Sequence, residues 1–400
     1  LEWSDFFNLT NLIKKKLLEN KLVLDPLFIH YLFDEPKLLQ KNSIDFIKEE
    51  FKNTSNKNKE IKNSNLKNSK IKIGYFSGDF YNHPVLHVMK NIYKNHDKSK
   101  FEIYAFSHGP DKKDNVWRED VKQYFNEFFD INNMNDEDVI KLSEEKKINI
   151  AVNLNGLTKH DRTGVFFKRV APIQINYLGY PGTMGMNSMD FIIADKIIIP
   201  ENEKKHYIEE VLYLPKCYIP SSNDVLLTGS DKNFSRSEFN LPYNKIVFCA
   251  FHNPLKINPE LFDSWINILK KVEGSVLWIK TNNQSIKHNI IKEANLRGFD
   301  SRRIVIADGI KDINDHIKRL ELADIFLDSY PYNSHSTTYD YIRAKLPMVI
   351  WKGQSFASRV ASSIYSSIDM HELIANNKTE YENIAIELAN DKSKLNEIKN

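Results

Sequence analysis

Cysteine is nearly absent from this chain of 400 residues, which contains only Cys217 and Cys249. The two residues form no CxxC pair and no cluster with histidine at metal-ligand spacing, which argues against a zinc site or a disulfide framework. Net charge is also scarce, because 56 Lys and Arg residues balance 53 Asp and Glu residues to within +3. A dedicated nucleic-acid binder needs a larger cationic excess to neutralise several phosphates. We therefore expect no nucleic-acid partner, and any bound anion should be small.

Long apolar runs are missing as well. No stretch approaches the ~18–20 residues that span a bilayer, and the first twenty residues lack the order of a signal peptide. We therefore expect a soluble, cytoplasmic protein without a membrane partner. The chain begins with Leu1 rather than Met, so it is expected to be a piece of something longer.

The first seventy residues differ in composition from the rest. Apolar residues recur at helical spacing over 1–51, which predicts a short helical lead-in, with Pro36 expected to break the run. Residues 52–70 contain little besides Asn, Lys and Ser. They are too polar to bury a core and are predicted to be a linker.

From residue 71 onward, short apolar strands alternate with amphipathic helices in two series, separated by an irregular stretch over 217–244. Alternation of this kind predicts parallel sheets covered by helices. We expect two Rossmann-like, doubly wound α/β domains at 71–240 and 241–400, the second ending in helices. The ligand is expected in a cleft between them.

Polar residues that follow the strands of the second domain suggest an anion site. Ser336, Thr337 and Thr338 are expected in the first turn of a helix, where N–H groups and hydroxyls bind phosphate or simply cap the helix. Asp340, one turn later, accepts ribose hydroxyls or complements the helix dipole. Lys256 either neutralises a departing pyrophosphate or lies in solvent. The chain has no GxxxxGK[ST] motif and no GxGxxG after a strand, which argues against NTPases and simple dehydrogenases. A nucleotide diphosphate bound without obligatory Mg²⁺ is favoured.

The first domain offers a candidate base. His83 and His87 flank Pro84, the predicted start of a helix, so that the His83 imidazole is placed to accept a proton from a hydroxyl. His87 is expected to pack within the protein, since a metal pair lacks a third ligand. Glycines at 179, 182 and 185 permit close approach to a ligand or form a tight turn.

Six uncommon motifs occur along the chain: GYFSGDFYNHPVLHVM, NLNGLTKHDR, APIQINYLGYPGTMG, AFHNPLKINPE, DHIKRLELADIFLDSYPYNSHSTTYD and ASRVA. In this order they resemble the catalytic region of the O-GlcNAc transferase and SPINDLY family of protein glycosyltransferases, family 41, in its bacterial branch. The resemblance covers about 70–400. The WSDFFNL of the lead-in is similar to the connector that follows an array of tetratricopeptide repeats in this family. This sequence contains no such repeats. An array of tetratricopeptide repeats is therefore expected only upstream of it, in the full-length protein.

The resemblance implies a two-lobed GT-B enzyme that transfers a sugar from a UDP-sugar to Ser or Thr hydroxyls of a protein, with inversion and with neither metal nor cofactor. It implies that His83 is the catalytic base or an acceptor-site residue and that Lys256 binds the donor β-phosphate. It also implies that His316 and Arg319 contact the uracil and nucleotide. His335, Ser336 and Thr337 are implied to bind the pyrophosphate. Asp340 is implied to bind the ribose, and Leu178 and Gly179 to border the donor sugar. Asn253 and Tyr332 complete the implied nucleotide-sugar site.

Some positions depart from the family pattern and bear on the donor. Tyr332 stands where animal members have a cysteine that lines the N-acetyl pocket, and its larger ring would narrow that pocket. Asn149 and Ile313 replace a histidine and a lysine. His335, which plant SPINDLY fucosyltransferases replace by threonine, favours a uridine donor. We expect UDP-GlcNAc as the donor. Two other donors stay open, UDP-glucose and GDP-fucose. Two other functions also stay open: a nucleotide-sugar epimerase or hydrolase, and a non-catalytic scaffold that binds a UDP-sugar.

Overall fold

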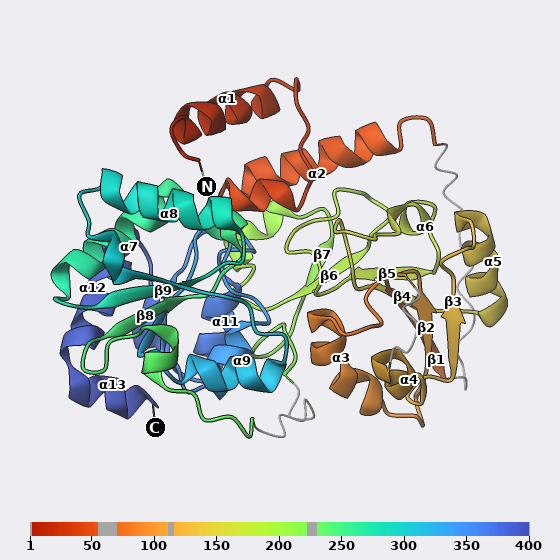
Figure 1. Cartoon of the computed structure of the whole chain (residues 1–400). Coiled ribbons are helices and arrows are strands. Elements are labelled where there is room, and N and C mark those ends of the chain that lie inside the picture. The colour runs from red at the N-terminus through yellow and green to blue at the C-terminus, as the bar shows by residue number, and fades with distance from the viewer. Residues whose placement is uncertain (1, 55–69, 111–115, 222–229, 400) are drawn as a thin grey trace. The chain divides into compact units, whose positions relative to one another are not determined.

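The chain folds into two compact units in a computed structural model that describes residues 2–54, 70–110, 116–221 and 230–399. The N-terminal unit comprises Lys16–His30 and Glu35–Val225, and the C-terminal unit comprises Leu1–Lys15, Tyr31–Asp34 and Leu226–Asn400. Most of the linker predicted at 52–70 lies outside the described residues. Each unit contains one sheet flanked by helices (Figure 1).

The described part of the N-terminal unit is built on a seven-stranded sheet of order β3-β2-β1-β4-β5-β6-β7, in which all neighbours are parallel. This is the strand order of a doubly wound Rossmann fold with one added edge strand. The strands are β1 (Ile71–Ser77), β2 (Phe101–Ser107), β3 (Glu127–Asp130), β4 (Ile150–Asn153), β5 (Ile173–Asn176), β6 (Phe191–Ala194) and β7 (Glu210–Tyr213). The helices are α2 (Pro36–Glu50), α3 (Pro84–Lys94), α4 (Val116–Lys122), α5 (Asp136–Lys146), α6 (Thr163–Phe167) and the 3-10 helix η2 (Glu201–His206).

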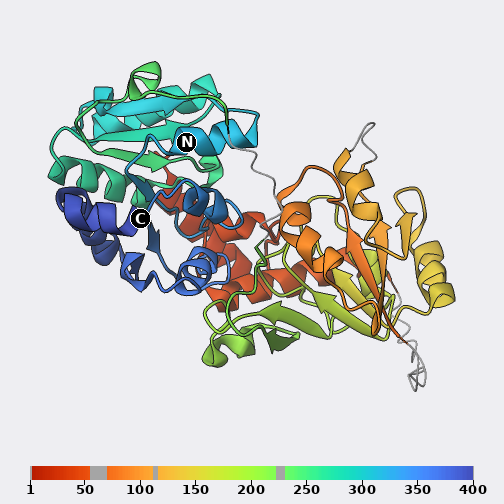
Figure 2. The ribbon, with the colours of Figure 1, turned by 90° about the horizontal axis from the view of Figure 1, so that it is seen from below.

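The described part of the C-terminal unit repeats this topology with the order β10-β9-β8-β11-β12-β13, again with parallel neighbours. Its strands are β8 (Val247–Ala250), β9 (Val276–Lys280), β10 (Ile304–Ala307), β11 (Ile325–Leu327), β12 (Met348–Trp351) and β13 (Ile374–Ala375). Its α-helices are α7 (Pro259–Lys271), α8 (Gln284–Leu296), α9 (Ile313–Leu320), α10 (Thr338–Arg343), α11 (Val360–Ser366), α12 (Lys378–Asn390) and α13 (Lys392–Lys399). Its 3-10 helices are η3 (Arg236–Phe239), η4 (Pro254–Lys256), η5 (Ser301–Arg303) and η6 (His371–Leu373). Figure 2 shows the flanking helices of both units from below.

Burial explains why the central strands could be located from the sequence. Every residue of β8, β11 and β12 is buried, as expected of strands covered on both faces by helices. In the N-terminal unit, the rings of Phe76 on β1 and Phe106 on β2 stack with centroids 4.3 Å apart. The predicted pair of Rossmann-like α/β domains is confirmed. The edge strands β3 and β13 were not predicted, since β3 is only half-buried and β13 has two residues.

The lead-in does not form a separate unit. Helix α1 (Phe6–Leu18) is preceded by Trp3, whose ring packs on Phe262 of the C-terminal unit with centroids 5.4 Å apart. The sequence predicted that Pro36 breaks a helix. Pro36 is instead the first residue of α2, where its missing N–H costs nothing. Helix α2 then packs into the N-terminal unit through buried residues such as Leu38 and Ile47.

The division between the units falls at 225/226 rather than at the expected 240/241. Polar contacts bind the segment that follows to the C-terminal unit. Ser230 Oγ donates to Asp315 Oδ1 at 2.7 Å, and the Arg236 guanidinium pairs with Asp324 at 2.8 Å. These contacts have no periodic signature, so the hydrophobic pattern alone did not place the boundary.

No helix within the described residues is long and apolar enough to cross a membrane.

The fully buried side chain of Gln174 on β5 provides a test of the N-terminal core. Its amide donates to the carbonyls of Phe166 (2.9 Å) and Ser188 (2.6 Å), and its oxygen accepts from Val170 N–H (2.8 Å). Gln174→Met removes the partner of the Val170 N–H and of the Ser188 carbonyl, whereas the Phe166 carbonyl still accepts from Arg169 N–H, so the free energy of unfolding should fall by about 2 kcal/mol or more. Urea unfolding measures the loss. The exposed neighbour Ile173 is the control: Ile173→Thr should change stability by less than ~0.5 kcal/mol. Equal urea midpoints for the two variants would contradict the role of the Gln174 side chain in pairing these buried backbone groups.

Candidate functional site

In each unit, the two strands at the topological switch point end beside each other. These pairs are β8 with β11 in the C-terminal unit and β1 with β4 in the N-terminal unit. Chains leave such a pair toward opposite faces of the sheet, so the carboxyl edge between them is where ligands of doubly wound folds bind. Lys256 follows β8, the 328–338 loop follows β11, and His83 follows β1. His316 and Arg319 instead follow β10, and Leu178 and Gly179 follow β5.

The segment after β8 presents Lys256. Asn253 caps the 3-10 helix η4, its Oδ1 accepting from Leu255 N–H at 3.1 Å. Lys256, the last residue of η4, donates from Nζ to the Asn333 carbonyl at 2.6 Å and lies 4.3 Å from the centroid of the Tyr332 ring. Burial lowers the pKa of Lys256 to about 8, an effect that the Asp328 carboxylate partly offsets. Lys256 is therefore not a solvated surface lysine.

The loop over 328–338 that follows β11 is internally hydrogen-bonded. Asp328 is fully buried, and its Oδ1 accepts from Ser334 N–H at 2.8 Å. The Asn333 amide donates to the carbonyls of Ser329 (2.7 Å) and Trp351 (3.2 Å). Burial raises the pKa of Asp328 to about 6, while the Ser334 N–H and Lys256 oppose the shift. The loop therefore presents the Asn333 carbonyl to Lys256 from a fixed backbone.

The helix after this loop begins later than expected. Helix α10 starts at Thr338, Thr337 is its N-cap without a side-chain bond, and Ser336 precedes the helix. The prediction that Ser336 and Thr337 lie in the first turn is therefore wrong, because His335–Thr337 form a turn instead. Within α10, Asp340 Oδ1 accepts from Arg343 at 3.4 Å, and burial raises the pKa of Asp340 to about 6.

A cationic group lies beside β8 and α9. Arg319 is almost fully buried; it donates to the Asp308 carbonyl at 2.6 Å, and its terminal nitrogen is 3.2 Å from His316 Nδ1. Lys280, the last residue of β9, lies 6.0 Å from the centroid of the Phe251 ring. Burial, and then the charges of Lys280 and Arg319, lower the pKa of His316 to about 3, so this imidazole is neutral at pH 7.

Lys280 was missed by the sequence analysis. Burial and the neighbouring Arg319 lower its pKa, whereas Asp340 acts in the opposite direction. Two neighbouring cations with lowered pKa values make this group a candidate anion site. The sequence did contain a signal that could have pointed to Lys280: it is a lysine at the carboxyl end of the strand that neighbours β8.

In the N-terminal unit, His83 lies where predicted, at the start of α3. It is the N-cap, and its Nδ1 accepts from Val85 N–H at 3.3 Å while lying 3.6 Å from Asp79 Oδ2. In this arrangement a neutral ring carries its proton on Nε2. To accept a proton at Nε2, the ring must take the other tautomer, with its Nδ1–H directed at Asp79. Asp79 is buried, and burial raises its pKa against the opposing effect of His83.

Asn155 connects the ends of β1 and β4. Its Oδ1 accepts from Gly78 N–H at 2.6 Å, and its amide donates to Asp79 Oδ2 at 2.9 Å. The same side chain therefore orients the carboxylate beside His83. Leu178 and Gly179 are close to it in the fold, because a Cβ on Gly179 would come within 2.1 Å of the Leu154 carbonyl.

The turn at Leu178 is strained. Its φ is +79°, and Gly179 N–H donates to the Tyr177 carbonyl at 3.1 Å, which closes a three-residue turn. A bulky residue rarely adopts this conformation, and such strain concentrates at functional sites. Glycine is required at position 179 because the Leu154 carbonyl leaves no room for a side chain.

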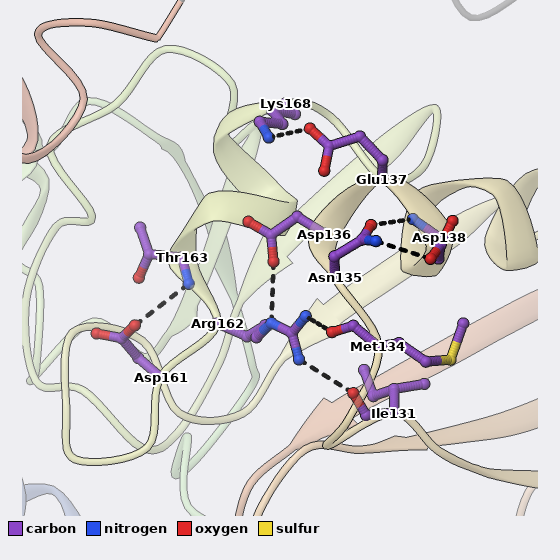
Figure 3. Close-up of polar contacts among 10 residues, drawn as sticks. All are labelled: Ile131, Met134, Asn135, Asp136, Glu137, Asp138, Asp161, Arg162, Thr163 and Lys168. Atoms are coloured by element: carbon purple, nitrogen blue, oxygen red, sulfur yellow. Dashed lines mark hydrogen bonds and ion pairs between the residues drawn. The ribbon is translucent and has the colours of Figure 1, made fainter.

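Arg162 anchors the end of the loop that starts at Asn155. Its Nε donates to Asp136 Oδ1 at 2.9 Å, and its two terminal nitrogens donate to the carbonyls of Ile131 (3.1 Å) and Met134 (Figure 3). These contacts tie the start of α6 to the chain between β3 and α5. They make Arg162 of the NLNGLTKHDR motif a structural residue.

The predicted site residues thus form three groups. Lys256 lies with Tyr332 and His335, whose rings stack at 4.6 Å. His316 and Arg319 lie together, linked through Lys280 to Asp340. His83, Leu178 and Gly179 belong to the N-terminal unit. Among the described residues, no group of three or more His, Cys, Asp or Glu side chains is arranged to hold a metal ion.

The model of glycosyl transferase family 41 matches residues 44–229 and 223–400. The chain belongs to this family. The prediction of a glycosyltransferase related to the O-GlcNAc transferase and SPINDLY proteins is therefore confirmed at the level of the family.

Named relatives agree with this membership. The chain is 33% identical over 331 residues to the probable UDP-N-acetylglucosamine–peptide N-acetylglucosaminyltransferase SEC of Arabidopsis thaliana, covering 81% of this chain and 33% of that protein. It is 28% identical over 337 residues to SPINDLY of the same plant, covering 82% and 36%. The chain thus spans about a third of the length of these curated relatives.

A solved structure has the same fold. The O-GlcNAc transferase of Thermobaculum terrenum, a mutant form, matches with a TM-score of 0.83 at 22% identity, covering 94% of this chain and 71% of that one. The predicted GT-B fold is confirmed by this likeness.

The Asn155–Asp79 contact yields a pH-dependent prediction. Asn155→Asp keeps the acceptor for Gly78 N–H but replaces the donor to Asp79 with a second carboxylate. Two carboxylates at one buried site raise the pKa of the pair, so the folded state binds more protons than the unfolded state. The melting temperature should therefore fall most at pH 7, with the deficit shrinking as the pH is lowered toward ~4.

The matched control for this pH dependence is Asn149→Asp at the other end of β4. There the side-chain oxygen accepts from Lys72 N–H at 2.8 Å, and the substitution keeps that bond. A deficit that does not vary with pH in Asn155→Asp would show that Asp79 is not its partner.

Proposed function

We propose that this chain carries the catalytic part of an enzyme that transfers N-acetylglucosamine from UDP-GlcNAc to Ser or Thr hydroxyls of proteins, with inversion and without a metal ion. The two plant relatives described above are named as probable peptide N-acetylglucosaminyltransferases. The observation that carries the proposal is the partly buried amine of Lys256, held at the carboxyl edge of the switch-point strands by Asn333 and Tyr332.

Lys256 supplies the charge that the reaction needs. When the sugar leaves, negative charge builds on the β-phosphate of UDP, and a cation preorganised in a poorly hydrated site stabilises it. The low pKa of Lys256 reflects such a site. His335 beside Tyr332 adds a second donor, and His316, Arg319, Lys280 and Asp340 are left for the nucleoside.

His83 is proposed as the base. A hydroxyl is a poor nucleophile at neutral pH, so it must lose its proton as it attacks the anomeric carbon from the side opposite to UDP. The His83 ring accepts that proton at Nε2 in the tautomer whose Nδ1–H is directed at Asp79. Proton transfer to a positioned side chain contributes roughly 10²–10⁴-fold to the rate.

Tyr332 supports a second candidate donor. The ring is 9% exposed and is stacked against His335, so it occupies space in the pocket where an acetamido group would lie under the family resemblance. UDP-glucose, which lacks that group, is therefore the alternative. Competition between UDP-GlcNAc and UDP-glucose in one transfer reaction distinguishes the two donors.

The reaction product separates the remaining alternatives. An epimerase or hydrolase releases an epimer or free sugar without a protein acceptor, and a scaffold binds UDP without turnover. GDP-fucose as the donor is tested by replacing UDP with GDP in a binding titration. The acceptor protein, an upstream repeat array and a cytoplasmic location stay predictions.

We expect the affinity for UDP, measured by calorimetry, to depend on pH through Lys256. The cationic amine binds the diphosphate, so affinity is full below the pKa of about 8 and declines above it. The decline should approach tenfold between pH 8.5 and 9.5, and GDP should bind more weakly throughout. Lys256→Met should weaken UDP binding about 10- to 100-fold and flatten the pH profile. Lys271→Met, on the exposed end of α7, is the control and should behave as wild type.

His83→Ala should reduce turnover by roughly 10²–10⁴-fold while UDP still binds with wild-type affinity, because the base touches the acceptor and not the nucleotide. His87 offers a matched control on the same helix, where its Nε2 lies 2.8 Å from Asn82 Oδ1. His87→Ala should keep the rate within a few-fold. Unchanged turnover in His83→Ala would move the base to another residue.

A further inference from the structure

Besides Leu1–Lys15, the four-residue segment Tyr31–Asp34 of the lead-in belongs to the C-terminal unit, although the residues on both sides of this segment belong to the N-terminal unit. Two residues of the segment, Tyr31 and Asp34, contact the loops that follow β11 and β12. We call this pair the lead-in clasp. It lies about 300 residues from those loops in the sequence, so no local pattern connects them.

Asp34 gathers donors from both loops. One carboxylate oxygen accepts from Ser355 N–H at 2.8 Å and from Ser358 Oγ at 2.5 Å. The other accepts from Gln354 N–H at 2.7 Å and from the Tyr330 hydroxyl at 3.1 Å. A Cβ on Gly353 would come within 2.2 Å of Asp34 Oδ2, so a side chain at this position would displace the carboxylate. Charge-assisted bonds of this kind are roughly twice as strong as neutral ones.

Tyr31 supports the ring that contacts Lys256. Its ring stacks on Tyr332 with centroids 4.8 Å apart and an interplanar angle of 15°. Tyr332 in turn stacks on His335 at 4.6 Å and lies under the Lys256 amine at 4.3 Å. Stacked aromatic pairs contribute beyond the area they bury. The orientation of the Tyr332 ring, and with it the position of the amine, therefore depends on Tyr31.

The two contacts converge on the same backbone. The carbonyl of Ala357, in the loop that Asp34 holds, accepts from Asn333 N–H at 3.0 Å and lies 3.2 Å from His335 Nε2. Asn333 is also the residue whose carbonyl accepts from Lys256. Displacing either clasp residue would shift the Lys256–Asn333–His335 group, whereas His316, Arg319 and Asp340 lie on α9 and α10.

We propose that Tyr31 and Asp34 are positioning residues for the diphosphate end of the donor site. The inference rests on the function proposed above, in which Lys256 binds the β-phosphate. The clasp touches neither the nucleotide nor the sugar in this proposal. It holds the lysine and the loop carbonyl in the geometry that a diphosphate requires, so it affects the β-phosphate contribution to binding and leaves the nucleoside contribution unchanged.

The test compares the affinities of the full chain for UDP and UMP by calorimetry. The ratio of the UMP to the UDP dissociation constant reports the β-phosphate contribution alone, and a general loss of structure does not change it selectively. For Asp34→Asn and Tyr31→Ala, we expect the ratio to fall by about tenfold, with UMP affinity within twofold of wild type. Lys256→Met serves as the positive control and should reduce the ratio at least as much.

Two milder variants keep the test decisive if either substitution impairs folding. Tyr31→Phe retains the stacked ring and should retain the wild-type ratio. Ser358→Ala removes a single bond to Asp34 and should reduce the ratio less than Asp34→Asn does. An unchanged ratio in Asp34→Asn, Tyr31→Ala and Ser358→Ala, or equal weakening of UMP and UDP, overturns the role of the clasp while the proposed function stands. Failure of the wild-type chain to bind UDP overturns both.

Discussion

The switch point of a parallel sheet is the constraint on which the rest of this structure depends. Where neighbouring strands send their chains to opposite faces, no connection fills the carboxyl edge between them, and loops can present polar groups there. The chain uses this edge twice, with Lys256 and the 328–338 loop in one unit and with Asp79, His83 and Asn155 in the other. Buried, partly paired charges collect at both edges, and their pKa values are shifted as a result.

Much of this arrangement could be predicted from the sequence, because covered strands are continuous apolar runs and the polar residues follow where those runs end. The two series of strands and helices were recognised on this basis, and the structure has one parallel sheet in each. The start of α10 was not located, since Ser336 and Thr337 fit a turn and a first helical turn equally well by composition. Lys280 was missed because its low exposure arises from β8 and α9, which only the fold brings beside it.

The tautomer of His83 was likewise beyond the sequence. Whether Nδ1 accepts from Val85 N–H or donates to Asp79 is decided by the placement of one ring between two partners at 3.3 and 3.6 Å. Such a near balance suits a group that must alternately lack and hold a proton, since neither state is fixed by an overwhelming contact. Residue type gives the capacity for this chemistry, and only the surrounding contacts determine its direction.

The assignment of Tyr31–Asp34 bears on how this family can be divided and recombined. The backbone passes from one unit to the other four times, near residues 15, 30, 34 and 225. Neither unit is an unbroken stretch of sequence, so a chimera joined only at the central boundary would pair the C-terminal sheet with lead-in segments from the other parent. Transfer of the C-terminal sheet into another chain therefore requires Tyr31–Asp34 to travel with the distant loops that these residues contact.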